Sequence, residues 1–558
     1  MKRALTWTLA AVAVIGVGGF FAFQHYRLYL PGIIGNLRNP IQKNQEVVWA
    51  KAPAAPAEAA RKPNIILIVA DDLGMNDLTS TGTGVAGDVT VGGVAGGAVP
   101  TPSIDSIARD GVTFTNGYAG NATCSPSRAA MLTGRYPTRF GFEFTAVPVM
   151  FARNIAQMGG HSGNTPPIFH KERIKDVPPV DQMGVPASEV TIAETLKGAG
   201  YRTLHLGKWH LGESEGMRPE DQGFDETLGF YAGAAMFLPK DSPDVVNSVQ
   251  EWDPIDVFLW ANLPWSVRFN GSKPFEPKGY MTDYLGDEAA RAIAANKDAP
   301  FFMYLAFNAP HTPLQAKKED YDALAGIKDH RLRVYAAMIR SLDRNVGKVL
   351  AEVERQGLAD NTIIIFTSDN GGANYIGLPD INKPYRGFKA TFFEGGIHVP
   401  FFMKWPGQIP AGSATPARAM HFDVFATAMT AAGAQGPAAG VLDGVDLVAL
   451  SRGKVADRPL FFRSGPYRTV IWKDWKLQLA ETPKKAWLFD LASDPLEHDN
   501  LAAARPDKVK ELTAMLDAQD RRAAKPLWPA LIEGPMWIDR PSDGKPMPKD
   551  AEYVMWSN

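Results

Sequence analysis

Cysteine is almost missing from this chain, because Cys124 is the single cysteine among 558 residues. One cysteine excludes an intramolecular disulfide framework of the kind that stabilises small secreted domains. The count leaves the redox compartment of the protein open. The apolar and charged fractions are those of ordinary globular proteins, so we expect stability to come from a sizeable hydrophobic core.

The chain also lacks an excess of charge of either sign. Its 58 Lys and Arg residues nearly balance its 60 Asp and Glu residues, which gives a formal net charge of −2. No long basic run occurs in the sequence. Proteins that bind nucleic acids need a basic surface that neutralises phosphates. We therefore expect no nucleic-acid partner.

A long apolar run is present at the N-terminus. Lys2 and Arg3 precede residues 4–23, and this length of about 20 residues suits a membrane-spanning helix better than the roughly 7–15 of a signal peptide. No small-x-small cleavage site follows directly, so we favour an uncleaved anchor over a cleaved signal for residues 1–23. Basic residues tend to stay in the cytoplasm. The rest of the chain is therefore expected to be exported, either on the periplasmic face of the inner membrane or in the periplasm or extracellular space.

The remaining chain divides by its patterns into three parts. Residues 24–61 are expected to be a linker, because alanine and proline dominate positions 52–57. Residues 62–455 are expected to form a catalytic domain. From residue 456 to 558 shorter alternating segments and a helix over 506–521 predict a smaller α+β unit with an antiparallel sheet.

Four nearly continuous apolar runs predict the sheet of the larger domain. Such runs are typical of strands buried on both faces, as in a parallel sheet covered by helices. Segments with helical spacing of apolar residues lie between them, at 191–198, 284–295 and 333–357. The fold class is therefore α/β, with a large, mostly parallel sheet flanked by helices. The four runs are residues 65–70, 203–206, 301–307 and 363–366.

Each of these runs is followed by residues that can do chemistry. Ligands in open α/β sheets bind beyond the carboxyl ends of the strands. Asp, Asn and Gly after a single strand are common in polar turns, but four endings of complementary chemistry are hard to assign to turns alone. The residues in question are Asp71, Asp72, Lys208, His210, His311, Asp369 and Asn370.

The segment around the lone cysteine resembles the signature of the type I sulfatases. It reads Cys124-Ser125-Pro126-Ser127-Arg128, and Thr133-Gly134-Arg135 follows. The resemblance runs from about residue 63 to 501 and implies an alkaline-phosphatase-like fold. Its other motifs stand in the family's order: NIILIVADDLG at 64–74, TPSID at 101–105, GKWHLG at 207–212, PHTP at 310–313, SDNGG at 368–372, and Lys389 with EGG at 394–396.

The resemblance implies an unusual nucleophile. In this family a formylglycine-generating enzyme oxidises the cysteine, here Cys124, to formylglycine (3-oxoalanine). The hydrated aldehyde then attacks the sulfur of an organic sulfate ester and forms a covalent sulfated intermediate. By the same resemblance Arg128, Lys208 and Lys389 hold sulfate oxygens, and His210 takes a proton from the hydrate. His311, together with Lys389, donates to the departing oxygen.

A divalent cation is the second implied component. The expected ligands supply oxygen atoms alone, which favours Ca²⁺ or Mg²⁺ over zinc or copper. We favour Ca²⁺ because the family uses it and because carboxylates grouped with an amide suit its flexible coordination. The expected ligands are Asp71, Asp72, Asp369 and Asn370.

The leading hypothesis is thus a sulfuric ester hydrolase acting on a sulfated small molecule or glycan, with aryl, carbohydrate and alkyl sulfates all open. A phosphonate or phosphate monoester hydrolase and an anchored binding protein without the aldehyde are the alternatives. For Arg128, an ion pair on the protein surface is the alternative to a role in binding sulfate. An aromatic segment has two open interpretations, a wall of the substrate site or ordinary core. Its members are Trp252, Phe258, Trp260, Trp265 and Phe269.

Overall fold

A computed structural model describes residues 28–53, 61–81, 99–159, 165–438 and 440–558. The predicted anchor over residues 1–23 and the glycine-rich segment 82–97 lie outside the described residues. Within the described ranges, no helix combines the length and the apolar character needed to cross a membrane.

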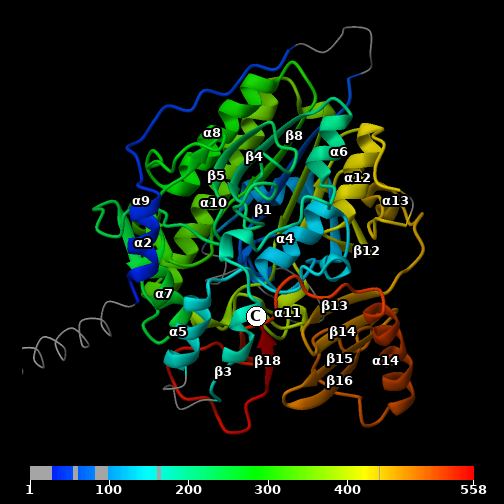
Figure 1. The fold of residues 1–558 in the computed structure, drawn as a ribbon. Helices are drawn as coiled ribbons and strands as arrows, with labels where there is room; N and C mark the ends of the chain where they lie inside the picture. The colour runs from blue at the N-terminus through cyan, green and yellow to red at the C-terminus, as the bar shows by residue number, and fades with distance from the viewer. Residues whose placement is uncertain (1–27, 54–60, 82–98, 160–164, 439) are drawn as a thin grey trace, which may run out of the picture.

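A nine-stranded sheet forms the centre of the molecule (Figure 1). Five neighbouring strands, β10, β1, β8, β4 and β5, are parallel, whereas β11 and β7 run antiparallel to their neighbours. The four predicted apolar runs form four of the adjacent parallel strands, so the predicted fold class is confirmed. In spatial order the strands are β12 (Ser413–Met420), β2 (Val112–Tyr118), β11 (Phe401–Lys404), β10 (Thr362–Ser368), β1 (Asn64–Ala70), β8 (Phe301–Ala306), β4 (Arg202–Lys208), β5 (Glu226–Phe230) and β7 (Arg268–Phe269).

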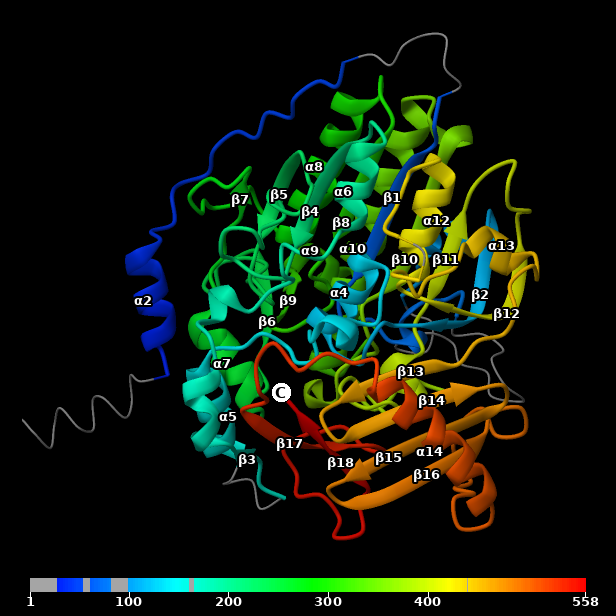
Figure 2. The same ribbon diagram turned by 45° about the vertical axis from the view of Figure 1, so that its right-hand side comes forward.

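Helices cover both faces of this sheet (Figure 2). In β1, Ile66 and Ile68 pack in one core cluster with residues of α3 (Pro102–Arg109), α8 (Met281–Asn296) and α10 (His330–Arg355). Ile65 and Leu67 pack in a second cluster on the opposite face. The continuous apolar sequence of β1 follows from burial on both sides. The helices of the second cluster are α4 (Cys124–Thr133), α6 (Ile192–Gly198), α12 (Asp423–Ala432) and α13 (Leu447–Ser451).

A second, antiparallel sheet follows in the sequence, as predicted. It consists of β13 (Leu460–Ser464), β14 (Tyr467–Trp472), β15 (Trp475–Glu481) and β16 (Lys484–Asp490). Apolar residues of α14 (Pro506–Asp520) cover one face, and the other face packs against residues of the catalytic body such as Phe392 and Phe393. The domain boundary at 455/456 stays a prediction.

The smaller elements gather beyond the carboxyl ends of the central strands. Here β17 (Ile532–Trp537) pairs with both β18 (Tyr553–Ser557) and β3 (Ile168–Phe169), so the end of the chain returns to the catalytic body. Helix α5 (Val149–Gly159) contacts α7 (Pro254–Asn262) and β17. The other elements are α2 (Leu30–Arg38), α9 (Lys318–Ala323), α11 (Glu394–Ile397) and the pair β6 (Val245–Ser248) and β9 (Leu314–Lys317).

Candidate active site

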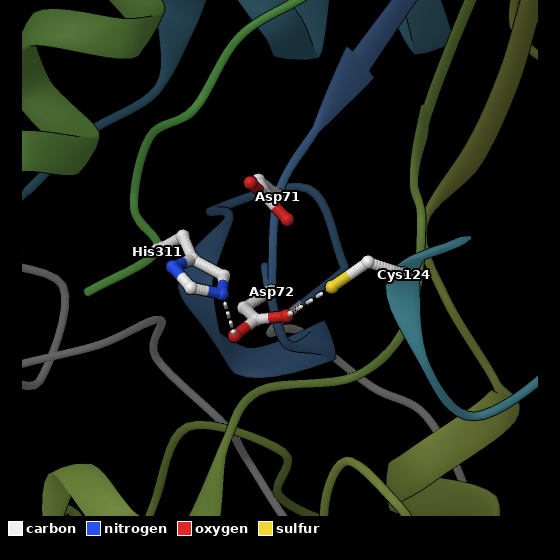
Figure 3. A group of neighbouring side chains, drawn as sticks. All are labelled: Asp71, Asp72, Cys124 and His311. Carbon is white, nitrogen blue, oxygen red and sulfur yellow. Dashed lines mark hydrogen bonds and ion pairs between the residues drawn. The ribbon is translucent and has the colours of Figure 1, made fainter. Parts of the chain in front are cut away.

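The predicted site residues meet at one edge of the large sheet. Asp71 and Asp72 follow β1, His311 follows β8, and Asp369 follows β10. These strands are parallel, so their carboxyl ends share an edge. Figure 3 shows Asp72 between Cys124 and His311, with Asp71 close by. One ligand atom from each of these four side chains lies within 4.8 Å of the others.

Cys124 is the first residue of α4 and is 3% exposed. Its Sγ lies 3.7 Å from Asp72 Oδ1. Burial raises the pKa of the Cys124 thiol well above its ordinary value, and the charge of Asp369 raises it further. The thiol is therefore protonated at neutral pH, and a protonated thiol is a poor nucleophile.

Three buried carboxylates of the site each face a cationic side chain. Lys208 Nζ donates to both oxygens of Asp71 at 2.8 Å. Lys389 Nζ lies 2.7 Å from the carboxylate of Asp72. Arg128 Nε donates to Asp369 Oδ2 at 2.9 Å. Pairing of this kind offsets the free-energy cost of burying charged groups.

The structure contradicts the alternative role of Arg128 as a surface ion-pair partner. The Arg128 side chain is fully buried and reaches Asp369 from the second turn of α4. Its Nη1 also donates to the hydroxyl of Tyr304 at 3.1 Å. The small residues of the α4 sequence, Ser127 and Ala129 among them, are themselves buried, so the helix lies deep in the protein and carries Arg128 inward.

The pKa values of the three carboxylates shift in different directions. Burial raises the pKa of Asp71 to about 7 even though Lys208 lowers it. For Asp369, burial raises the pKa, but Arg128, Lys208 and Lys389 together outweigh it and hold the pKa well below its usual range. Burial also raises the pKa of Asp72, but Lys389, His311 and Lys208 together lower it below its ordinary value. An additional positive charge beside Asp71 would therefore stabilise its ionised form.

The predicted metal ligands lie together and fit a hard cation. Asn370 Nδ2 donates to Asp72 Oδ1 at 2.8 Å, while Asn370 Oδ1 has no hydrogen-bond partner among the described residues. An amide oxygen in that state is an available ligand close to the carboxylate of Asp72. Asp369 accepts the backbone N–H of Asp72 at 3.1 Å through Oδ1, and its other oxygen faces Arg128. Oxygen donors of this kind suit Ca²⁺ or Mg²⁺.

Two histidines border the same space. His210 has a positive φ of 61°, and an added Cβ on Gly233 would come within 2.6 Å of the His210 ring. His311 Nδ1 donates to the Thr312 carbonyl at 2.5 Å, so its Nε2 faces Asp72 at 3.6 Å. Burial lowers the pKa of both histidines, that of His311 to about 3. Both imidazoles are therefore neutral at pH 7 in this arrangement.

Sequence reasoning missed two tyrosines of the site. The hydroxyl of Tyr375 lies 3.4 Å from Asp72 Oδ2, and Lys389 Nζ lies 5.9 Å from the centre of the Tyr375 ring. Tyr304 binds Arg128 through its hydroxyl. Tyr304 could have been identified from the sequence, because a tyrosine in a strand that is predicted to be fully buried needs a hydrogen-bond partner for its hydroxyl. Tyr375 follows β10 without any pattern that marks it.

The members of the aromatic segment have different surroundings. Phe258 lines a cavity next to Cys124, as one of the two interpretations requires. Trp252 donates to the Ser542 carbonyl, Trp260 donates to Asp256, and Phe269 packs against Trp49. Trp265 packs against the core cluster that contains α8 and α10. The wall interpretation therefore holds for Phe258 and not for the other four.

The cavity has a volume of about 350 Å³. Cys124, His210, His311, Tyr375 and Lys389 line its inner end. A sulfate ester whose sulfur reached Cys124 would therefore have its organic group in this cavity.

Comparisons with known proteins found a matching family model, similar sequences and a similar solved structure. A family model described as Sulfatase matches residues 63–434. N-acetylgalactosamine-6-sulfatase of Rattus norvegicus is 33% identical over 73% of this chain and 70% of the relative. Steryl-sulfatase of the same organism is 31% identical over 78% of each chain. A crystal structure described as "Ps i-CgsB in complex with k-i-k-neocarrahexaose" superposes with a TM-score of 0.68 at 30% identity, covering 84% of this chain and 95% of that one.

Proposed function

The chain belongs to the sulfatase family and is a sulfate ester hydrolase; from that membership we propose that it acts through a formylglycine made from Cys124 and a divalent cation. One observation supports this most strongly. Cys124 Sγ lies 3.7 Å from Asp72, inside a buried group of paired carboxylates and cations.

The charged side chains suit a sulfate group. Sulfate esters resist hydrolysis because their oxygens are negative and the leaving alkoxide is poor, so charge neutralisation and protonation of the leaving oxygen are both needed. The hydrated aldehyde at position 124 would supply the nucleophilic oxygen, and a bound cation would neutralise charge on the sulfate oxygens. Lys208, Lys389 and Arg128 supply fixed positive charge at the same place without reorganisation.

His210 and Lys389 are placed to exchange protons with the substrate, whereas His311 donates its Nδ1–H to Thr312 and presents an Nε2 without a proton. His210 lines the cavity beside Cys124, and its Nδ1 has no partner among the described residues, so it is free to accept a proton there. His311 Nε2 and Lys389 Nζ lie 3.6 Å and 2.7 Å from the carboxylate of Asp72, and both would flank the leaving oxygen. The carboxylate of Asp72 keeps the pKa of Lys389 high in spite of burial, so this ammonium carries a proton to donate.

The cation is proposed to be Ca²⁺, with Mg²⁺ as the alternative. Asp71, Asp72, Asp369 and Asn370 would hold it. Two observations support a positive ion at this place: Asn370 Oδ1 has no partner in the described part of the chain, and the buried carboxylates of Asp71 and Asp72 lie close together.

Export, anchoring and maturation are also part of the proposal. The N-terminal segment would hold the enzyme at the membrane, with the catalytic body outside the cytoplasm, after a formylglycine-generating enzyme has oxidised Cys124. Helix α2 follows this segment and exposes Ile33, Ile34 and Leu37. Exposed aliphatic side chains beside an anchor suit contact with lipid.

Membership of the family leaves several organic groups as candidates for the substrate. The names of the relatives divide between a sulfated sugar, in N-acetylgalactosamine-6-sulfatase, and a sterol sulfate, in steryl-sulfatase. Their identities to this chain, 33% and 31%, do not separate these alternatives.

Mass spectrometry of the peptide containing Cys124 tests the nucleophile. We expect the mass of formylglycine in protein produced with its maturation enzyme, and loss of turnover of p-nitrophenyl sulfate in Cys124→Ala with an unchanged melting temperature. Full turnover by protein with an unmodified thiol would refute the proposal.

Two further assays test the reaction and the cation. We expect p-nitrophenyl sulfate to be hydrolysed faster than p-nitrophenyl phosphate or phenyl phosphonate, and a preference for phosphorus would favour the alternative hydrolase. Chelation should abolish activity, and Ca²⁺ should restore it better than Mg²⁺. Full activity after chelation would show that no cation is needed.

A further inference from the structure

The walls of the cavity come from elements that lie far apart in the sequence. Helix α5 contributes Phe151 and Ile155, α7 contributes Phe258 and Leu259, and the C-terminal strands contribute Met536 and Trp556. Figure 2 shows α5, α7 and β17 close together beyond the edge of the large sheet. The rings of Phe151 and Phe258 pack edge to face with centroids 5.0 Å apart. Beyond the reactive residues, the space is therefore bordered mainly by hydrocarbon.

The polar side chains on these walls offer little to a ligand. The hydroxyl of Tyr231 donates to Glu220, and Asn558 Oδ1 accepts the backbone N–H of Thr145. Glu213 remains as a wall carboxyl, and burial raises its pKa. A sugar carries a hydroxyl on most of its carbons, and each buried hydroxyl without a partner weakens binding. Besides Glu213, the wall side chains offer the hydroxyls of Thr123 and Thr145, the amide nitrogen of Asn558 and the indole nitrogen of Trp556. Apolar side chains therefore outnumber the groups that could bind sugar hydroxyls.

We propose that the organic group of the substrate is an apolar alcohol or phenol of fused-ring size, and not a sugar. This inference rests on the proposed function, because it assumes that sulfur is bound at Cys124. A cavity of about 350 Å³ falls within the range of sites that enclose drug-sized molecules. The sulfate lies among the charged residues at the inner end, and the ring system fills the apolar remainder.

The decisive experiment compares sulfate esters of phenols with similar acidity, so that the leaving oxygen is equally poor along the aromatic series. The full-length, formylglycine-containing enzyme with Ca²⁺ is assayed with phenyl sulfate, 2-naphthyl sulfate, a phenanthryl sulfate and N-acetylgalactosamine 6-sulfate. We expect kcat/KM to rise by about tenfold or more along the aromatic series, since a hydrophobic site gains that much from small increments of apolar size. The sugar sulfate should be the poorest substrate. A sugar sulfate that matches or exceeds the phenanthryl ester overturns the inference.

A matched pair of variants on α7 tests the wall itself. Leu259 lines the cavity, whereas Val257 on the same helix does not. Leu259→Ser should lower kcat/KM for the phenanthryl ester by about tenfold and leave p-nitrophenyl sulfate within a few-fold. Val257→Ser should change neither value. Equal losses on both esters in Leu259→Ser would contradict an apolar subsite.

Binding separates this inference from the proposed function. Calorimetric titration of the same enzyme with phenanthrol and with N-acetylgalactosamine needs no turnover. Binding of phenanthrol that weakens in Leu259→Ser supports the apolar subsite even if no sulfate ester is hydrolysed, a result that would refute the proposed function alone. Binding of the sugar without binding of phenanthrol overturns the inference even in an active enzyme.

Discussion

At the scale of single residues, Arg128 and Asp369 show how buried charges set the geometry of the site. Arg128 Nε donates to Asp369 Oδ2 at 2.9 Å, and Nη2 lies 2.8 Å from the same oxygen. Neither side chain is exposed. A buried pair of this kind contributes little net stability, but loss of one partner leaves an uncompensated charge. The pair therefore fixes the orientation of both residues toward Asp71 and Asp72.

Arg128→Lys tests this pairing. Lysine keeps the charge but cannot form the planar contacts of a guanidinium, so we expect kcat/KM to fall by more than tenfold, or about 1.4 kcal/mol. Tyr304→Phe is the matched control, because it removes a single hydrogen bond to Arg128, and its activity should stay within a few-fold. Kinetics with p-nitrophenyl sulfate measure both variants. Equal activities of the two would show that the guanidinium geometry is irrelevant.

At the scale of elements, paired glycines bring two segments of the site together. Gly371 N donates to the Gly396 carbonyl at 3.1 Å, and an added Cβ on Gly371 would lie 1.9 Å from the Gly395 carbonyl oxygen. Lys389 N donates to the Gly372 carbonyl at 3.0 Å. This close approach ties the loop after β10 to α11 and holds Lys389 above Asp72.

Gly371→Ala should therefore separate these segments. We expect a loss of activity of at least tenfold and a lower free energy of unfolding, because the contacting atom is backbone and cannot move aside alone. Gly326→Ala is the control, since an added Cβ there meets nothing within 4 Å. Urea unfolding and p-nitrophenyl sulfate turnover measure the difference. Indistinguishable variants would argue against the close approach.

The strands of the large sheet were predictable because their chemistry is local. Residues 65–70 and 363–366 are apolar throughout, and both are followed by acids, so the sequence predicts both the buried strands and the metal ligands after them. The cavity was not predictable in the same way. Its walls combine α5, α7, β17 and β18, and nothing in the spacing of Phe151 and Met536 indicates that they share one space.

Asp77 links the loop after β1 to α10, and its titration should make the free energy of unfolding depend on pH. Its Oδ2 accepts Gly74 N at 2.7 Å and the hydroxyl of Tyr335 at 2.6 Å, and burial raises the pKa of Asp77 to about 8. This pKa lies above the ordinary value of 3.8, so the folded state binds the proton more tightly than the unfolded state. The contribution to stability is complete below pH 3.8 and is lost as the pH rises through 8.

Asp77→Asn should remove this dependence, because an amide resembles the neutral acid. Urea unfolding of both proteins at pH 5 and at pH 8.5 measures it. We expect the unmutated protein to lose more unfolding free energy over this interval than the variant does. Parallel losses in the two proteins would mean that Asp77 has an ordinary pKa.

At the scale of the whole molecule, one lysine joins the C-terminal sheet to the catalytic body. Lys476 on β15 is fully buried, and its Nζ lies 2.7 Å from Glu394 and 2.9 Å from Glu497. Glu394 begins α11, and its other oxygen contacts His398 Nδ1 at 2.8 Å and accepts the hydroxyl of Tyr118 at 3.0 Å. Lys476 thus neutralises the negative charge of Glu394 in the catalytic body and of Glu497 in the C-terminal part of the chain. The two parts are expected to unfold together.

Lys476→Met keeps the length of the side chain and removes the charge. Two buried carboxylates then lose their common cation, and we expect a cost of about 3–5 kcal/mol in unfolding free energy. Lys484→Met on the neighbouring strand β16 is the control, because Lys484 is exposed. Denaturant unfolding, followed by tryptophan fluorescence and by circular dichroism, should give one transition for the unmutated protein and an earlier one for Lys476→Met. If both variants unfolded at the denaturant concentration of the unmutated protein, the buried lysine would not be what couples the C-terminal sheet to the catalytic body.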